Sequence, residues 1–386
     1  MARTKSNIHG REGVAGWIFT APMIIILGVF LFIPVLMALW VSMTNWAGNG
    51  NPFSGGSNAK FVGITNYTDL FLRDGLTRKT FMQSLGNTFY YVLLVVPIQT
   101  LTSLLLALVV NNKLLRGKSF FRTAFYFPSV TSSIAISTVF LFLFSNTGAV
   151  NAFFGFFGIT GPQWFSDSRG LLHLGFNAVG VDNPSWGQGE IFGRSLWDWL
   201  AGPSVAMCVI IILAIWTTTG TFMLMFLAAL QDLPVEVDEA AALDGVSPWQ
   251  KFRLVTVPML RPAIFLVVTL GLIGTWQVFD SIYVMGKGNP DGTTMTPAFL
   301  SYSQSFNSLK FGSGAAMAFV VFLIIVLLTW FQRRVMAEDK KPSRWRHRSA
   351  ITGATASGAT TAGTPGTAAT TTTEPTESTG ATGGRR

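Results

Sequence analysis

Long apolar runs alternate along the chain with shorter polar connections. A helix of about 20 apolar residues is long enough to cross the hydrocarbon core of a bilayer, and several windows of the chain meet this requirement. They are Trp17–Met43, Thr88–Val110, Thr123–Phe144, Val205–Leu230, Ala263–Met285 and Ala315–Phe331. No stretch alternates in polarity residue by residue, as a strand of a membrane barrel does. The pattern therefore predicts an all-α fold: a polytopic membrane protein with six transmembrane helices.

The composition excludes an ordinary soluble protein. Of the 386 residues, 49% are hydrophobic and only 12% are charged, whereas soluble domains carry roughly 25% charged residues. The single cysteine excludes a disulfide scaffold. Both observations agree with a chain that lies mostly in a bilayer.

Basic residues are distributed unevenly between the two sets of connections. With the N-terminus inside, the inside segments 1–16, 111–122, 231–262 and 332–386 hold 19 of the 27 Lys and Arg residues. Cytoplasmic segments of membrane proteins carry such an excess. We therefore expect both termini in the cytoplasm. The net charge of +9 then reports orientation and not a nucleic-acid partner.

The windows divide the chain into three parts. Residues 1–16 form a cytoplasmic N-terminus, 17–336 the six-span domain, and 337–386 a basic segment with a Thr/Ala/Gly tail. After Ala350 the tail holds almost no large apolar residue, so we expect it to be disordered, and the sequence assigns it no role. The outer connection Ser145–Ser204 predicts either an interfacial aromatic belt or a docking surface for an outside partner. Its tryptophans are Trp164, Trp186, Trp197 and Trp199.

Ionisable side chains are almost absent from the predicted spans. Only Asp280 lies within one, and it is either hydrated at the nearby outer surface or takes part in solute contact or gating. Uncharged polar side chains gather in spans three to five, where they either join helices or line a path for a neutral, hydroxyl-rich solute. They are Ser129, Thr131, Ser132, Ser133, Thr217, Thr218, Thr219, Thr221, Thr275 and Gln277.

The sequence encodes no energy source of its own. His9, His173 and His347 are scattered, so neither a metal site nor catalytic residues are predicted. Gly117-Lys118-Ser119 is like the end of a phosphate-binding loop, but Asn112 stands where that loop requires glycine. We therefore expect no enzyme and no cofactor in this chain. If solute movement is not coupled to an ion gradient, its energy must come from elsewhere.

The cytoplasmic loop 231–262 has the signals of a helix–glycine–helix hairpin. Pro234 suits a helix N-terminus, and Gly245 suits the left-handed position that ends a helix. Ser247 and Gln250 predict a capping box that starts a second helix, which we expect to end at Pro258. The apolar stripe of that helix is Trp249, Phe252 and Val255. Such a hairpin either lies on the lipid surface or docks in a partner's groove.

The same loop carries a known signature of Glu-Ala-Ala, three residues, Gly, nine residues and Ile-x-Leu-Pro. The chain reads Glu239-Ala240-Ala241, Gly245 and Val255-Thr256-Val257-Pro258, with the spacing intact and valine in place of Ile and Leu. It thereby resembles the permease subunits of binding-protein-dependent ABC importers, of the sugar type similar to the larger maltose permease subunit. Further matches are Phe61–Tyr67, Leu115–Lys118, Trp216, Phe279–Tyr283, and Gly288-Asn289-Pro290 in place of Gly-Gly-Pro.

The resemblance implies a type I ABC importer permease fold in a bacterial cell membrane and a set of partners. These are a cytoplasmic ABC ATPase dimer that binds ATP and Mg, a second homologous permease subunit, an extracytoplasmic solute-binding protein, a sugar or polyol substrate, and membrane lipid. The implied ATPase-coupling residues are Glu239, Ala240, Ala241, Asp244, Gly245, Trp249, Phe252 and Pro258. The substrate path would be lined by Ser129, Ser133, Thr217, Thr218, Thr221, Thr275, Gln277, Val278 and Asp280.

Two other classes of function stay open at this stage. An ion-coupled secondary transporter would move solute without an ATPase, and a membrane scaffold or sensor would move none. The sequence does not identify the solute, and the contacts made by the long outer connection 145–204 itself cannot be carried over from the resemblance.

Overall fold

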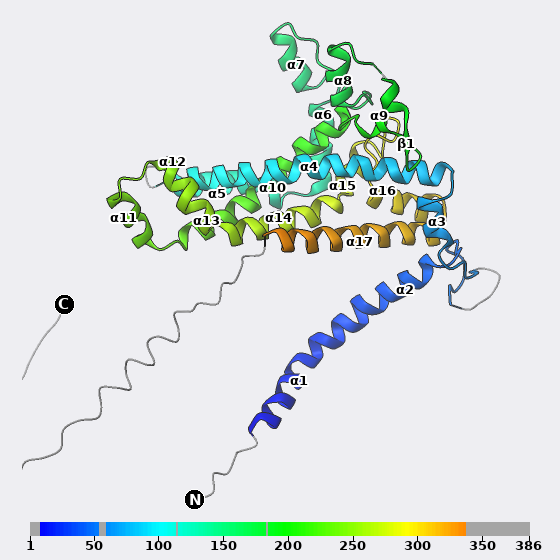
Figure 1. Ribbon diagram of the computed structural model, residues 1–386, viewed down its shortest axis with the longest axis horizontal. Helices are drawn as coiled ribbons and strands as arrows, with labels where there is room; N and C mark the ends of the chain where they lie inside the picture. The colour runs from blue at the N-terminus through cyan, green and yellow to red at the C-terminus, as the bar shows by residue number, and fades with distance from the viewer. Residues whose placement is uncertain (1–7, 54–58, 113–114, 183, 337–386) are drawn as a thin grey trace, which may run out of the picture. The chain divides into compact units, whose positions relative to one another are not determined.

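The computed structural model describes residues 8–53, 59–112, 115–182 and 184–336, and Figure 1 shows how its helices are arranged. The chain divides into two units, Met1–Ala337 and Glu338–Arg386. The predicted tail, 337–386, and residues 1–7 of the predicted N-terminal segment lie outside the described residues.

In the described part of the chain, long apolar helices lie at the windows predicted to span the membrane. Five helical stretches are long and apolar enough to span a membrane, or six when one bent pair is counted as a single span. They are Ala15–Ser42, Leu76–Asn111, Val205–Gln231, Arg261–Met285, Phe311–Val335, and the pair Lys118–Val130 with Ser133–Leu143. The predicted helical, polytopic fold is confirmed.

The elements before the outer connection are helical. They are α1 (Ile8–Leu27), the π-helical turn η1 (Gly28–Phe32), α2 (Ile33–Ser42), α3 (Thr65–Phe71), α4 (Leu76–Asn111), α5 (Lys118–Val130) and α6 (Ser133–Leu143). The outer connection adds α7 (Ala149–Phe156), α8 (Leu171–Ala178), the 3-10 turn η2 (Ser185–Gln188), the antiparallel strands β1 (Glu190–Ile191) and β2 (Arg194–Ser195), and α9 (Leu196–Trp199).

The second half of the described chain is likewise helical. Its elements are α10 (Val205–Gln231), α11 (Val235–Leu243), α12 (Pro248–Lys251), the π-helical turn η3 (Phe252–Thr256), α13 (Val257–Met259), α14 (Arg261–Trp276), α15 (Asp280–Met285), α16 (Pro297–Tyr302), the π-helical turn η4 (Ser303–Asn307) and α17 (Phe311–Met336).

The third span is not one continuous helix as the window Thr123–Phe144 predicts. Helix α5 ends at Val130, α6 begins at Ser133, and the two axes differ by 96°. Thr131 and Ser132 have extended ψ angles of 149° and 126°. Hydroxyl side chains compete with the helix for backbone hydrogen bonds, and Thr131 Oγ1 donates to the Phe127 carbonyl at 3.0 Å. The break places a polar, non-helical segment inside the span.

The fifth window is interrupted in a similar way. Helix α14 ends at Trp276, and α15 begins at Asp280 after a break that contains Gln277 and Phe279. The backbone nitrogen of Gln277 donates a hydrogen bond to the Gly274 carbonyl, which closes the last turn of α14. Two spans are therefore broken, and each break lies beside a polar sequence.

Most tryptophans of the outer connection serve its internal packing. The Trp197 ring is 8% exposed and stacks on His173 at a centroid distance of 4.4 Å. Trp164 Nε1 donates to Asn151 Oδ1 at 2.8 Å, and Trp199 Nε1 donates to the Ile191 carbonyl at 3.1 Å. Buried Trp197 is not available for an interfacial belt or for a docking surface. The exposed aromatic residues of the connection are Phe153, Phe156, Phe157 and Trp186, and for these both alternatives stay predictions.

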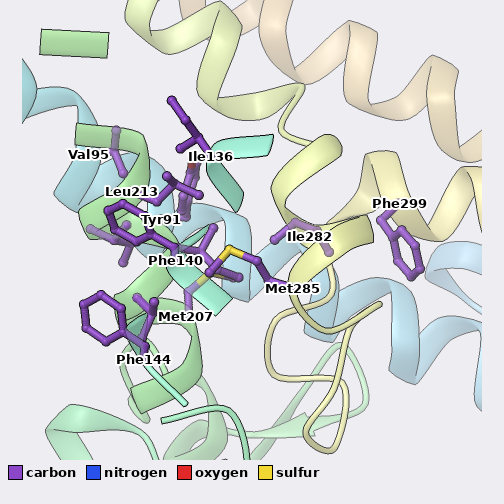
Figure 2. Packing of buried hydrophobic residues seen from close by; sticks show 13 residues of the cluster. Tyr91, Val95, Ile136, Phe140, Phe144, Met207, Leu213, Ile282, Met285 and Phe299 are labelled. Carbon is purple, nitrogen blue, oxygen red and sulfur yellow. The ribbon is translucent and has the colours of Figure 1, made fainter. Parts of the chain in front are cut away.

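Two apolar clusters hold the central helices together. The first joins α4, α6, α10, α15 and α16, and Figure 2 shows its side chains, among them Tyr91, Val95, Met207 and Leu213. The second joins α4, α10 and α14 and contains Leu104 of α4, Phe222 of α10 and Val267 of α14. Along both α4 and α10, the gap between the clusters contains polar side chains. The core therefore leaves a polar layer between two apolar ones.

Candidate functional site

Two adjoining cavities lie in this polar layer, each with a volume of about 300 Å³. Both are lined by Ser133, Thr218 and Ser281, so they share a wall. All the residues predicted to line a substrate path border one cavity or the other. Those on the first are Ser133, Thr218, Thr275, Gln277, Val278 and Asp280. Those on the second are Ser129, Ser133, Thr217, Thr218 and Thr221.

The helix breaks explain why residues from three spans meet here. The break after α5 places Ser133 at the shared wall, and the break after α14 brings Gln277 and Asp280 to the first cavity. Helix α10 contributes Thr217, Thr218 and Thr221 between its two apolar segments. The layer thus offers short polar side chains as hydrogen-bond partners, and its one carboxylate, that of Asp280, is exposed.

Close packing of α5 against α10 fixes the second cavity. Ser129 Oγ donates to the Thr217 carbonyl at 2.6 Å. A Cβ atom on Gly220 would lie 2.1 Å from the Phe125 carbonyl oxygen, so only glycine allows the two backbones to approach this closely. The absence of a side chain at Gly220 thus allows the close approach of α5 to α10 beside the second cavity.

The threonines of α10 divide into two groups. Thr217 and Thr218 border the cavities, whereas Thr219 is buried against α4, where its Oγ1 lies 3.2 Å from Thr102 Oγ1 and its carbonyl accepts from Ser103 Oγ. Both interpretations of the polar groups therefore apply, each to different residues. Thr219 joins helices, whereas Thr217, Thr218 and Thr221 border a cavity.

Asp280 begins α15 at the first cavity and is exposed. None of the three ion pairs found among the described residues involves it. The first cavity is also lined by neither lysine nor arginine. The arrangement thus presents hydroxyls, an amide and one carboxylate, which suits a neutral polar solute and disfavours an anion.

Sequence reasoning missed several residues of this site. The main one is Gln99 on α4, which is fully buried and lines the first cavity. A lone glutamine in the long apolar run of the second span was the signal that could have found it. The other missed lining residues include Tyr91, Ser137, Phe222 and Ser281.

The cytoplasmic hairpin forms by the predicted local rules. Helix α11 is followed by Gly245 with φ +67°. Ser247 caps α12. Its Oγ accepts a hydrogen bond from the backbone nitrogen of Gln250 at 3.3 Å, and the side-chain Oε1 of Gln250 accepts one from the backbone nitrogen of Ser247 at 3.0 Å. The helix–glycine–helix prediction is confirmed in these details.

Most of the predicted coupling residues lie on the surface of this hairpin. Glu239, Ala240, Asp244 and Gly245 are exposed, and Trp249 is 68% exposed. Ala241 is buried, Pro258 is partly buried, and Phe252 packs against the second apolar cluster. Large apolar side chains are also exposed nearby, namely Val235, Leu243 and Leu254. The hairpin therefore combines an anchor to the core with an uncovered apolar and acidic surface.

The second helix ends at Met259, one residue beyond the predicted end at Pro258, but it is not a regular α-helix throughout. Helix α12 continues through the wider turns of η3, in which the Val257 nitrogen donates to the Phe252 carbonyl, and then through α13. Proline cannot donate a backbone hydrogen bond and its ring needs space beside the preceding turn, which a π-helical turn supplies. Helix α13 ends at Met259, and α14 begins at Arg261 after the single residue Leu260. The hairpin is thereby joined to the fifth span without an intervening loop.

Comparison with known proteins agrees with this architecture. The family model described as the binding-protein-dependent transport system inner membrane component matches residues 70–337. The lactose transport system permease protein of Rhizobium radiobacter is 32% identical over 88% of this chain and 100% of its own. The multiple sugar-binding transport system permease protein of Streptococcus mutans is 28% identical over 82% of this chain and 93% of its own.

Two solved structures share the fold. A chain of a bacterial ABC transporter involved in the import of the acidic polysaccharide alginate superposes with a TM-score of 0.64 at 18% identity, over 86% of this chain and 99% of that one. A chain of a bacterial alginate ABC transporter in complex with a periplasmic protein that holds an alginate pentasaccharide gives a TM-score of 0.61 at 18% identity, over 85% and 96%.

Proposed function

Because the chain belongs to the family of binding-protein-dependent transport system inner membrane components, we propose that it is the permease subunit of an ATP-driven importer for a sugar or related polyol. The observation that carries this proposal is the pair of polar cavities, without a cationic side chain, at the breaks of two spans. A solute rich in hydroxyl groups needs hydrogen-bond partners there and no counter-charge.

Several features favour a neutral sugar over an acidic one. The cavities lack a cationic side chain, and Asp280 would repel a carboxylate. Relatives are named for lactose, for arabinooligosaccharides and for multiple sugars. The nine predicted path residues, Ser129 to Asp280, are proposed to contact the solute during passage.

The exposed surface of the hairpin favours the proposal that a separate subunit supplies the energy for transport. We propose that the hairpin docks in a groove of a cytoplasmic ABC ATPase dimer, which binds ATP and Mg and hydrolyses the nucleotide. Exposed Leu243, Trp249 and Leu254 provide apolar contact area, and amphipathic helices bind grooves through such side chains. The continuous path from α12 through α13 to α14 would carry closure of the ATPase into the fifth span. Residues Glu239 to Pro258 of the signature are the proposed coupling residues.

Three further partners complete the proposal. A second homologous permease subunit closes the solute path, and an extracytoplasmic solute-binding protein delivers the sugar. Membrane lipid surrounds the exposed apolar spans, of which α1 and α2 expose the most apolar side chains. The chain would lie in a bacterial cell membrane with both termini in the cytoplasm.

Purification and reconstitution test this function. We expect an ATPase and a second six-span protein to co-purify with the chain, and proteoliposomes of that complex to take up sugar only with ATP and the binding protein. Uptake driven by a proton gradient without nucleotide would identify a secondary transporter instead. The absence of any solute flux from the assembled complex would favour a scaffold or sensor and overturn the proposal.

A further inference from the structure

Gln99 stands apart from the other polar residues of the central helices. It lies on α4 between the two apolar clusters, its side chain is fully buried, and it lines the first cavity. Its Nε2 atom is buried and has no hydrogen-bond partner. A buried donor without an acceptor is unfavourable unless something occupies the space beside it.

The orientation of the Gln99 amide is set from two sides. Its Oε1 accepts a hydrogen bond from Thr218 Oγ1 at 2.7 Å, which ties the carbonyl to α10. Its Nε2 points toward α14, where a Cβ atom on Gly271 would lie only 2.4 Å away. Glycine at 271 therefore leaves room for the amide, and the bond to Thr218 holds it in place.

Helix joining alone does not account for this residue. One turn further along α4, Thr102 and Ser103 already connect this helix to α10 through Thr219. Each of these hydroxyls has an acceptor within the protein: Ser103 Oγ donates to the Thr219 carbonyl, Thr102 Oγ1 to the Ile98 carbonyl of its own helix, and Thr219 Oγ1 to the Ile215 carbonyl. The glutamine instead keeps both amide hydrogens unused at the wall of a cavity that also carries Ser133, Thr275 and Gln277.

We propose that Gln99 contacts the transported solute and helps to determine its specificity, with its amide donating a hydrogen bond to a hydroxyl or ring oxygen. Thr218 positions the amide, and Gly271 provides the space for it. This extends the solute contacts from spans three to five to the second span, and it rests on the proposed function. A site that donates a fixed hydrogen bond discriminates against an analogue that lacks the accepting oxygen.

The test uses the complete complex in proteoliposomes, with ATPase, second permease and binding protein. Its probe is whichever of lactose, maltose or arabinotriose the wild-type complex transports, compared with the monodeoxy derivatives of that sugar. The binding protein is saturated with each sugar, so that its own selectivity does not enter the maximal rate. Transport of none of these sugars by the wild type would contradict the proposed function and not this inference in particular.

We expect the wild type to transport one monodeoxy derivative more slowly than the parent sugar, by roughly two- to tenfold, the range that one neutral hydrogen bond gives. Gln99→Leu should abolish this difference by lowering transport of the parent sugar alone. Gly271→Ala, which displaces the amide while keeping the glutamine, should reduce the same difference. Co-purification of the ATPase verifies assembly, and Gln99→Met, which also lacks the donor, replaces the leucine variant if that one does not assemble.

Gln332→Leu is the matched control. Gln332 joins α17 to α14 by donating to Thr269 Oγ1 at 3.0 Å and lines neither cavity, so this variant should keep the discrimination of the wild type. The inference is overturned if Gln99→Leu and Gln99→Met change transport of every sugar by one common factor, or leave all of the rates unchanged.

Discussion

A single hydroxyl proton limits what Thr218 can bind at one time. Its Oγ1 lies 2.7 Å from the Ala214 carbonyl and also 2.7 Å from Gln99 Oε1, but a hydroxyl donates only one hydrogen. Its lone pairs stay available to a donor in the cavity. Thr218 can therefore accept a hydrogen bond from a solute hydroxyl while its own proton is used by the protein.

Replacement of cavity side chains should change which sugars are transported. We expect Thr218→Val and Gln277→Leu to alter the ratio of uptake rates between two sugars, because each removes a hydrogen-bonding group from the cavity wall. Uptake of radiolabelled lactose and maltose into proteoliposomes measures that ratio. Thr219→Val is the control, since Thr219 contacts α4 and borders neither cavity. If Thr218→Val and Gln277→Leu lower all rates equally, these residues have only a structural role.

Substitutions at Gly245 should affect transport according to how readily the new residue adopts a positive φ, and not according to its size alone. Its φ of +67° is in the left-handed region, and a Cβ atom there would meet nothing within 4 Å. L-residues in this region are strained by roughly 1–2 kcal/mol, with asparagine among the few that adopt it readily. We expect Gly245→Val to abolish ATP-driven uptake at normal expression and Gly245→Asn to keep most of it.

Uptake and ATP hydrolysis of the reconstituted complex check the Gly245 prediction. Unchanged uptake in Gly245→Val would remove the coupling role of the hairpin. Equal loss in both variants would instead show that side-chain volume at the hairpin surface matters, and the backbone explanation would fail.

Among the elements, α5 and α10 depend on a backbone contact that cannot relax. The atoms that a Cβ on Gly220 would meet are the Phe125 carbonyl oxygen at 2.1 Å and Tyr126 Cα at 2.8 Å, and backbone atoms cannot move aside as a flexible side chain can. We expect Gly220→Ala to destabilise the protein by about 1–3 kcal/mol, as overpacked cores generally are. Thermal unfolding of the purified protein in detergent measures this loss.

Gly175→Ala serves as the control for Gly220→Ala. Gly175 lies in α8, and a Cβ atom there would have no neighbour within 4 Å. Alanine also has the higher helix propensity, so this variant should not lower the unfolding temperature. A Gly220→Ala protein as stable as the wild type would show that the two helices can separate at no cost.

Elements governed by local chemistry were predictable from the sequence, and those governed by tertiary packing were not. Window Val205–Leu230 matches α10, and the capping box at Ser247 forms because its partners lie three residues apart. The 96° bend after Val130 and the break at Gln277 were not predicted. Hydropathy is averaged over a window of many residues, so it does not detect two or three residues that leave the helical conformation. Gln99 was missed for a related reason, since its importance depends on Gly271 of another helix.

At the scale of the whole molecule, basic residues and exposed surfaces together define an orientation. The outer connection, which contains α7, precedes α10 in the sequence, and the hairpin, which contains Gly245, follows it. Because α10 is predicted to cross the membrane once, the two segments are predicted to lie on opposite sides of the membrane. The excess of Lys and Arg predicts that the hairpin lies in the cytoplasm. The same assignment is required if the hairpin is to meet an ATPase.

Cysteine labelling tests this orientation directly. Cys208, the only cysteine in the sequence, is first replaced in a Cys208→Ser background. Val235→Cys and Phe156→Cys then report the two sides, because Val235 is 64% exposed on the hairpin, outside the proposed ATPase contacts, and Phe156 is 84% exposed on α7. We expect a membrane-impermeant maleimide to label Phe156→Cys in intact spheroplasts and Val235→Cys only in inside-out vesicles. The reverse pattern would place the hairpin outside the cell, where no ATPase could reach it, and would contradict both the charge argument and the proposed coupling.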